Sequence, residues 1–147
     1  MEIKNKRGEV LHTYEDSHDF SDLELREAVF AGLVLQGAHF SFTDLSGANC
    51  RGSDFYWGIF FSANLTRADL EGAQLQGADF KKADLTNANL KNANLGRDNL
   101  GGSSQLQGAN FTGADLRGTN LTGAEYDRET VFPLGFHPDK FGLILKD

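Results

Sequence analysis

The stretch ADLEGAQLQGADFKKADLTNANLKNANL (68–95) places leucine or phenylalanine at every fifth position. The same interval runs from Phe20 to Leu100, is broken only by Cys50, and resumes from Leu106 after one inserted residue. An amphipathic helix would repeat its apolar residues about every 3.6 positions, and a half-buried strand every second position. A five-residue interval therefore predicts a solenoid built from short repeating units.

Each five-residue unit has the same internal pattern around its leucine or phenylalanine, which we call the central residue. A small residue, most often alanine, lies two positions earlier, and Asp or Asn comes immediately before the central residue. Glycine recurs two positions after it. Asp, Asn and Gly favour tight turns, because the first two bond their own backbone and glycine tolerates positive φ. We expect the central and small residues to point inward, and the other three to line the outside.

Four segments show this unit most plainly, namely ADLEG (68–72), ADLTN (83–87), ANLKN (88–92) and ADLRG (114–118). They resemble the A-(D/N)-L-x-x unit of pentapeptide-repeat proteins, and the resemblance covers about three quarters of the chain. It implies an all-β fold, a right-handed quadrilateral parallel β-helix with one unit per face and twenty residues per coil. The twenty-two units of this chain would then make about five and a half coils.

An independent pattern agrees with a twenty-residue coil. Phenylalanine recurs at Phe20, Phe40, Phe60 and Phe80, although only about a third of the central residues are phenylalanine. On the outside, Arg51, Glu71 and Lys91 also lie twenty apart and alternate in charge. Residues on neighbouring rungs of a parallel sheet are about 4.8 Å apart, so we expect both sets to stack.

The chain divides into a solenoid over residues 18–128 and two flanking caps. Residues 1–17 are expected to form a capping hairpin with strands at Glu2–Lys4 and Glu9–Thr13, whose residues available to pack on the first coil are Ile3, Val10 and Leu11. Residues 129–147 leave the repeat and are rich in apolar side chains, so we expect them to close the last coil. Alternatively, the apolar residues of this second cap form a dimer interface.

Composition limits the function classes. The net charge of −7 and the isoelectric point near 5.0 argue against a nucleic-acid-binding surface, which needs clustered Lys and Arg. Cys50 is the only cysteine, so no internal disulfide is possible. The N-terminus lacks an apolar run of signal-peptide length, and no stretch approaches the roughly 20 apolar residues of a membrane span. We expect a cytoplasmic protein with no membrane association.

Large apolar residues interrupt the outward pattern at one place. They occupy positions that the repeat normally gives to polar residues, and they are Phe42, Tyr56, Trp57, Ile59 and Phe61. On the inside-outside rule they form one contiguous patch, which favours a site for an unidentified protein partner. Two alternatives stay open, because the N-terminal segment could fold over these rings, or a local bulge could turn some of them inward.

A second departure lies in LGRDNLGGSSQL (95–106), which contains the inserted residue. Here Asp98 takes a position normally held by a small inward residue, and an unpaired buried carboxylate would be costly. We expect Asp98 to face backbone N–H groups of a bulge and to hold it in place. The residues of this structural loop are Asp98, Gly101, Gly102, Ser103 and Ser104.

The sequence contains no recognisable catalytic arrangement. The four histidines lack metal-ligand spacing, and the many aspartates belong to the repeat itself. The glycine-rich stretch near residue 101 lacks the following Lys-Ser/Thr of a phosphate-binding loop. We therefore predict that the protein is not an enzyme and has no catalytic residue, no cofactor and no metal site.

Two function classes remain. The first is a non-catalytic solenoid module that binds another protein or serves as a scaffold, and we expect a monomer rather than a dimer. The second is a DNA-mimicking inhibitor of a type II topoisomerase, an activity that the family resemblance makes possible. Residues 20–126 contain twelve acidic and eight basic residues, so their net charge is only −4. The basic residues would interrupt any anionic stripe on the surface. The interaction module is the favoured interpretation.

Overall fold

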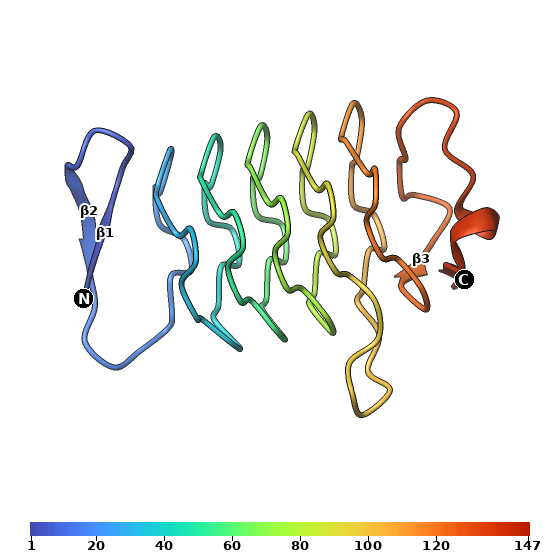
Figure 1. Cartoon of the computed structure of the whole chain (residues 1–147), viewed down its shortest axis with the longest axis horizontal. Coiled ribbons are helices and arrows are strands. Elements are labelled where there is room, and N and C mark those ends of the chain that lie inside the picture. Colours follow the sequence, from blue (N-terminus) through green and yellow to red (C-terminus); the bar gives the residue numbers. More distant parts are fainter.

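The computed structural model describes residues 1–147 and shows a row of stacked coils between two end segments (Figure 1). Regular elements occur only at the ends and are short. They are strands β1 (Glu2–Lys4), β2 (Val10–Thr13), β3 (Glu125–Tyr126) and β4 (Ile144–Leu145), and the 3-10 helix η1 (Pro138–Phe141). No helix has the length and hydropathy needed to cross a membrane.

Parallel β-bridges hold each coil to the next. Along one side of the solenoid the bridges join Asp19 to His39, His39 to Ile59 and Ile59 to Asp79, in steps of twenty residues. In each step the N–H of a central residue donates to the coil that follows, as Phe40 does to the C=O of Ile59 at 2.7 Å. A turn follows almost every central residue. The predicted twenty-residue spacing is therefore confirmed.

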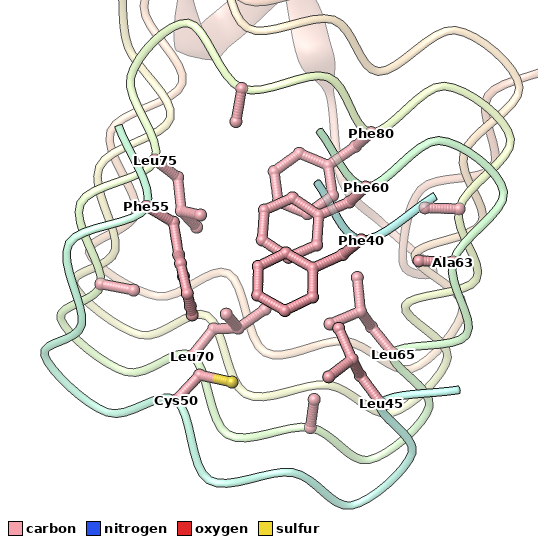
Figure 2. Packing of buried hydrophobic residues seen from close by; sticks show 14 of the residues in the cluster. Phe40, Leu45, Cys50, Phe55, Phe60, Ala63, Leu65, Leu70, Leu75 and Phe80 are labelled. Atoms are coloured by element: carbon pink, nitrogen blue, oxygen red, sulfur yellow. The ribbon is translucent and has the colours of Figure 1, made fainter. Parts of the chain in front are cut away.

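The interior is a set of stacked columns (Figure 2). The rings of Phe20, Phe40, Phe60 and Phe80 lie one above another, with centroids 4.8–5.0 Å apart and planes within 13°. Each fully buried leucine or phenylalanine contributes roughly 1.5–3 kcal/mol, and a stacked aromatic pair adds about 0.5–1.5 kcal/mol. The predicted phenylalanine column is confirmed, and it fills the space that a ligand cavity would need.

Cys50 belongs to this interior. It lies in the same column as Leu70, opposite the phenylalanine stack (Figure 2). Burial, together with the nearby Asp69, raises the pKa of the Cys50 thiol to about 12. The thiol is therefore neutral and acts as a small apolar side chain.

The N-terminal hairpin closes the first coil. Strands β1 and β2 pair antiparallel, and an antiparallel bridge from Asn5 to Ala28 joins the hairpin to the coil. Ile3 is buried, and the ring of Tyr14 lies edge-on to Phe20 at 5.0 Å. Val10, expected to pack inward, is exposed instead, because it occupies the outer side of a two-stranded ribbon.

The outward charged residues Arg51, Glu71 and Lys91 stack only partly as expected. The Arg51 guanidinium donates to Glu71 at 2.7 Å and also contacts Asp69 at 3.2 Å. Lys91 instead lies 3.8 Å from Asp115 on the next rung. These exposed pairs add little stability each, typically below about 1 kcal/mol.

The prediction of one inserted residue was wrong. Leu106, not Leu100, continues the column above Phe80, because Phe80 donates its N–H to the C=O of Gln105 and Asp79 pairs with Gln105. Leu100 is 84% exposed. The chain therefore leaves the coil after Leu95 and forms the loop that projects from the solenoid in Figure 1, which we call the 97–103 loop.

Candidate functional site

The five outward apolar residues lie on one side of the solenoid, and we call them the aromatic surface (Phe42, Tyr56, Trp57, Ile59 and Phe61). Tyr56 and Trp57 form the turn before Ile59, and Phe61 begins the turn after it. Phe42 lies in the corresponding turn one coil earlier, where its N–H donates to the C=O of Phe61 at 3.0 Å. The structure thus brings all five residues to one face and its two corners.

One half of the aromatic surface is a pair of phenylalanines. The rings of Phe42 and Phe61 meet edge to face, with centroids 5.6 Å apart. The Lys82 ammonium lies 5.9 Å from the centre of the Phe61 ring, within the range of a cation–π contact. Phe42 remains 58% exposed, so its own chain leaves most of this side chain in water.

The other half is held by the 97–103 loop. The rings of Tyr56 and Trp57 are 4.9 Å apart, and the Trp57 indole N–H donates to Oδ2 of Asp98 at 2.6 Å. The Tyr56 hydroxyl accepts from the N–H of Asn99 at 3.0 Å. The N-terminal segment, which the sequence left as a possible cover, packs on the first coil instead.

Asp98 organises the loop itself. Its Oδ1 accepts from the N–H groups of Leu100 and Gly102, at 2.8 and 2.6 Å. The Trp57 hydrogen bond and these backbone donors hold the pKa of the Asp98 carboxyl below its ordinary value. The carboxylate therefore closes the loop and ties it to Trp57 at the same time.

The residues assigned to the structural loop divide between two environments. Asp98, Gly101, Gly102 and Ser103 lie within the projecting segment. Ser104 is fully buried, at the inward position that alanine takes in most units. Its hydroxyl donates to the C=O of Leu75 at 3.0 Å and accepts from the N–H of Gly77 at 3.1 Å, so it anchors the return of the chain into the coil.

Gly77 lies directly against the indole ring of Trp57. A Cβ atom at this position would lie 2.5 Å from Cδ1 of Trp57, which is far inside a normal contact. The backbone of Gly77 also has φ of +70°, which favours glycine. The absence of a side chain at Gly77 leaves room for the Trp57 indole ring over the next coil, where it reaches Asp98 of the loop.

Two residues of the aromatic surface adopt an unfavourable backbone conformation. Phe42 has φ of 60° and Trp57 has φ of 58°, in the left-handed region that bulky side chains rarely occupy. All other non-glycine residues with positive φ are polar or charged, namely Asp22, Glu27, Ser62, Arg67, Lys82, Asn87 and Asn92. The fold accepts small or polar residues at these turns, so it does not itself require the two aromatic rings.

A shallow hollow of about 410 Å³ lies beside the loop, lined by Gln36, Tyr56, Trp57, Asn99 and Leu100. It contains no acid–base pair or nucleophile. No group of three or more His, Cys, Asp or Glu side chains is arranged to hold a metal ion anywhere in the structure. The residues that line the hollow offer apolar contact and hydrogen bonding.

Comparison with known proteins gives a family-level match. The family described as pentapeptide repeats matches in 8 copies, over residues 24–60, 59–97 and 103–125. The gap in the match falls within the 97–103 loop. Comparison with curated protein sequences finds no match.

Several solved structures are similar to this chain. HetL from the cyanobacterium Nostoc sp. strain PCC 7120, a pentapeptide repeat protein involved in heterocyst differentiation regulation, has a TM-score of 0.74 at 27% identity, covering 86% of this chain. This chain spans only 56% of HetL. The Nostoc pentapeptide repeat protein alr5209 is 34% identical over 88% of this chain and 86% of its own, with a TM-score of 0.42. The family match and the likeness to HetL imply a right-handed β-helix solenoid for this chain.

We expect the loop contact to depend on pH through Asp98. A lowered pKa means that the carboxylate favours the closed loop at neutral pH, and that this contribution is lost as pH falls through the lowered pKa, below the ordinary 3.8. Trp57 is the only tryptophan, so its fluorescence reports the contact. Emission should stay constant down to about pH 4 and change below it.

Asp98→Asn is the matched control for this titration. The amide oxygen still accepts from the loop backbone, but its NH₂ would face the Trp57 indole N–H, so the indole contact is lost. This variant should show altered Trp57 emission already at neutral pH and no separate acid step. An unchanged spectrum in Asp98→Asn would show that the carboxylate does not hold the ring. Far-UV circular dichroism at each pH separates the loop change from unfolding.

Two alanine substitutions test the close contact between Gly77 and the Trp57 ring. Gly77→Ala and Gly72→Ala place a Cβ at nearly the same positive φ, which costs each about 1–2 kcal/mol. Only Gly77→Ala also forces the indole away, whereas nothing lies within 4 Å of a Cβ at Gly72. We expect a further loss of about 1–3 kcal/mol and a shifted Trp57 emission only in Gly77→Ala. Equal melting and equal spectra of the two variants would contradict the placement of Trp57.

Proposed function

We propose, from the premise that this chain belongs to the pentapeptide-repeat family, that it is a non-catalytic interaction module whose aromatic surface binds a protein partner. The turn after each five-residue unit and the twenty-residue bridge spacing support a four-sided cross-section. With Leu100 outside the column, the stacked units amount to about five coils. Such a rod offers flat, rigid faces to a partner.

One observation carries this proposal, namely aromatic side chains at left-handed turn positions. Phe42 and Trp57 combine backbone strain with exposed apolar area, although polar residues satisfy the same turn elsewhere in the chain. Strain of this kind, of order 1–3 kcal/mol per residue, is concentrated at functional sites. Burial of the rings by a partner would offset both unfavourable contributions.

The geometry of the aromatic surface suits a binding site. Tyr and Trp are enriched among interface residues that dominate affinity. Their conformations are already restricted here, because the loop holds Tyr56 and Trp57 through two hydrogen bonds and Phe42 packs on Phe61. A surface that is ordered before binding loses less conformational entropy when the partner arrives.

The aromatic surface has neither an enclosed substrate cavity nor a free acid or base, which favours binding over catalysis. The interior columns are filled, so the solenoid offers no enclosed substrate cavity around the aromatic surface. The group with a lowered pKa nearest the rings is Asp98, whose carboxylate is occupied by three hydrogen bonds that close the loop. It is a structural group rather than a general acid or base.

DNA mimicry is the second candidate and has weaker support. A mimic needs a continuous anionic stripe, but many carboxylates here are neutralised by close cations. Asp44 pairs with Arg26 at 2.6 Å, and Asp115 pairs with Arg117 at 2.6 Å. The structure of QnrB1, a plasmid-mediated fluoroquinolone resistance protein, is 21% identical with a TM-score of 0.45, a likeness too low to support a shared function.

Site-specific photo-crosslinking tests the proposed surface. A benzophenone side chain at position 42 should crosslink one discrete protein in cells of the source organism. The same side chain at position 92 should not, because Asn92 has the same place in its unit and nearly the same φ but lies on another corner of the solenoid. Crosslinks that are equal from both positions, or absent from position 42, would contradict the proposal.

A stability control accompanies this experiment. Phe42→Gly relieves the positive φ, so it should not lower the melting temperature while it removes the exposed ring. Combined with Phe61→Ser, it should abolish affinity pull-down, without any crosslinker, of the partner that the crosslink at position 42 identifies. Full capture by this folded double variant would exclude the phenylalanine pair from the interface.

The alternative is tested by a supercoiling assay with a purified type II topoisomerase. We expect no inhibition at micromolar concentrations of this protein, because its outer charges are mixed. Inhibition that weakens as salt is added would instead favour an electrostatic mimic of DNA.

A further inference from the structure

The C-terminal end of the solenoid contains an incomplete rung. Among the leucine and phenylalanine central residues of the stacked units, from Phe20 to Leu121, only Leu116 is not buried. The C-terminal segment adds a rung above Asn110 through Val131 and another above Glu125 through Ile144. Between these points it crosses the end of the rod through η1, as the red segment of Figure 1 shows. The unit 114–118 therefore has no rung above it.

The backbone of this unit is correspondingly unpaired. The N–H groups of Leu116 and Gly118 and the C=O of Ala114 have no hydrogen-bond partner in the chain. The equivalent groups of the rung below are all paired with the next coil. Unpaired groups of this kind form the edge to which an added strand binds.

The preceding rung shows which hydrogen bonds an added strand would make to the unpaired N–H and C=O groups of this edge. The N–H of Leu90 donates to the C=O of Asp115 at 2.9 Å, and the N–H of Asp115 donates to the C=O of Ala88 at 2.9 Å. The N–H of Asn92 donates to the C=O of Arg117 at 3.0 Å. An extended segment lying parallel on the unit 114–118 would make the same three bonds one rung higher.

A hollow of about 550 Å³ is open above this edge, within the range of ligand sites. Leu116 lies in it together with Leu134, Phe136 and Phe141. Leu134 is fully exposed and Phe141 is 48% exposed. An inward-pointing leucine or phenylalanine of an added rung would pack against this apolar lining.

Charge specifies a further position of the added segment. Arg51, Glu71, Lys91 and Arg117 follow one another in a column along one corner of the rod, with Arg117 last. Lower in the column an arginine is paired with the glutamate of the next rung, as the 2.7 Å contact of Arg51 with Glu71 shows. Arg117 pairs with Asp115 of its own unit at 2.6 Å. An acidic residue on the next rung would add the kind of partner that Glu71 gives to Arg51.

We propose that this edge binds an extended segment of a partner protein as one additional rung of the solenoid. The segment carries a small residue, a polar residue, a leucine or phenylalanine, and an acidic residue in that order. Backbone hydrogen bonds to Leu116, Gly118 and Ala114 supply the register, and the apolar hollow and Arg117 supply the preference for sequence. This surface is separate from the aromatic surface.

The test uses the capped peptide acetyl-Thr-Gly-Ala-Asn-Leu-Glu-Gly-Ala-amide and the ¹⁵N-labelled full chain. On titration to millimolar peptide, the amide resonances of Leu116 and Gly118 should shift, and hydrogen exchange at both should slow. Amides around Phe42 should stay unchanged. The Phe42→Gly variant should bind the peptide equally, so that failure of this proposal and failure of the proposed function are distinguishable.

Peptide variants test each contact without altering the protein. N-methylation of the peptide asparagine removes the donor to Ala114 and should weaken binding by about three- to tenfold. Leucine-to-serine replacement in the peptide should abolish the shifts. Glutamate-to-lysine replacement should weaken binding, and the protein variant Arg117→Glu should restore it for the lysine peptide.

Three results would overturn the proposal. The first is the absence of shifts at Leu116 and Gly118 with millimolar peptide. The second is binding that is insensitive to N-methylation, which would show that the backbone edge is not used. The third is concentration-dependent self-association of the chain that protects the same amides without peptide, which would assign the edge to a second copy. Sedimentation velocity across the concentration range detects this last case.

Discussion

Direct stacking of each central residue on the central residue of the preceding coil is the constraint on which the structure depends. The rungs are fixed at hydrogen-bond spacing, so every unit must present a side chain that fills the same interior space. Leucine and phenylalanine do so in nearly all units, and the rings of Phe40, Phe60 and Phe80 show how closely the fit repeats. Turn geometry, capping segments and the outer surface all follow from keeping this stack in register.

The same constraint frees the outer positions. Three residues in five face outward and need only to satisfy the turns, so polar and charged side chains occupy most of them. Aromatic rings at Phe42 and Trp57 add nothing to the interior and are unfavourable at their backbone angles. The unpaired edge at Leu116 has another origin, because a solenoid must end somewhere and the C-terminal segment covers its last coil incompletely.

The sequence predicts features that repeat, and it fails where the repeat is interrupted. The five-residue interval identified the coils, and the strand pattern identified the hairpin at Glu2–Lys4. Leu100 was misplaced because it lies in phase with the interval, although Asp98 two residues earlier cannot occupy an inward position unpaired. Spacing alone does not reveal that a loop replaces a rung.

Contacts between residues far apart in the sequence could likewise not be predicted from the repeat pattern. Trp57 and Asp98 are 41 residues apart, and their hydrogen bond depends on the length and direction of the loop. A signal was present in the coincidence of a glycine-rich insertion and an outward tryptophan, but nothing in the pattern connects the two. The open edge depends in the same way on the path of η1 across the last coil, which no periodicity encodes.

Thermal unfolding of Leu85→Asp beside Asn87→Asp tests the central claim most directly. Leu85 is fully buried, whereas Asn87 is an exposed turn residue two positions later in the same unit. The stacked interior predicts that Leu85→Asp loses more than about 4 kcal/mol and no longer unfolds cooperatively, because it buries an unpaired carboxylate. Asn87→Asp should melt within a few degrees of the unmodified chain. Equal melting of the two variants would contradict the account.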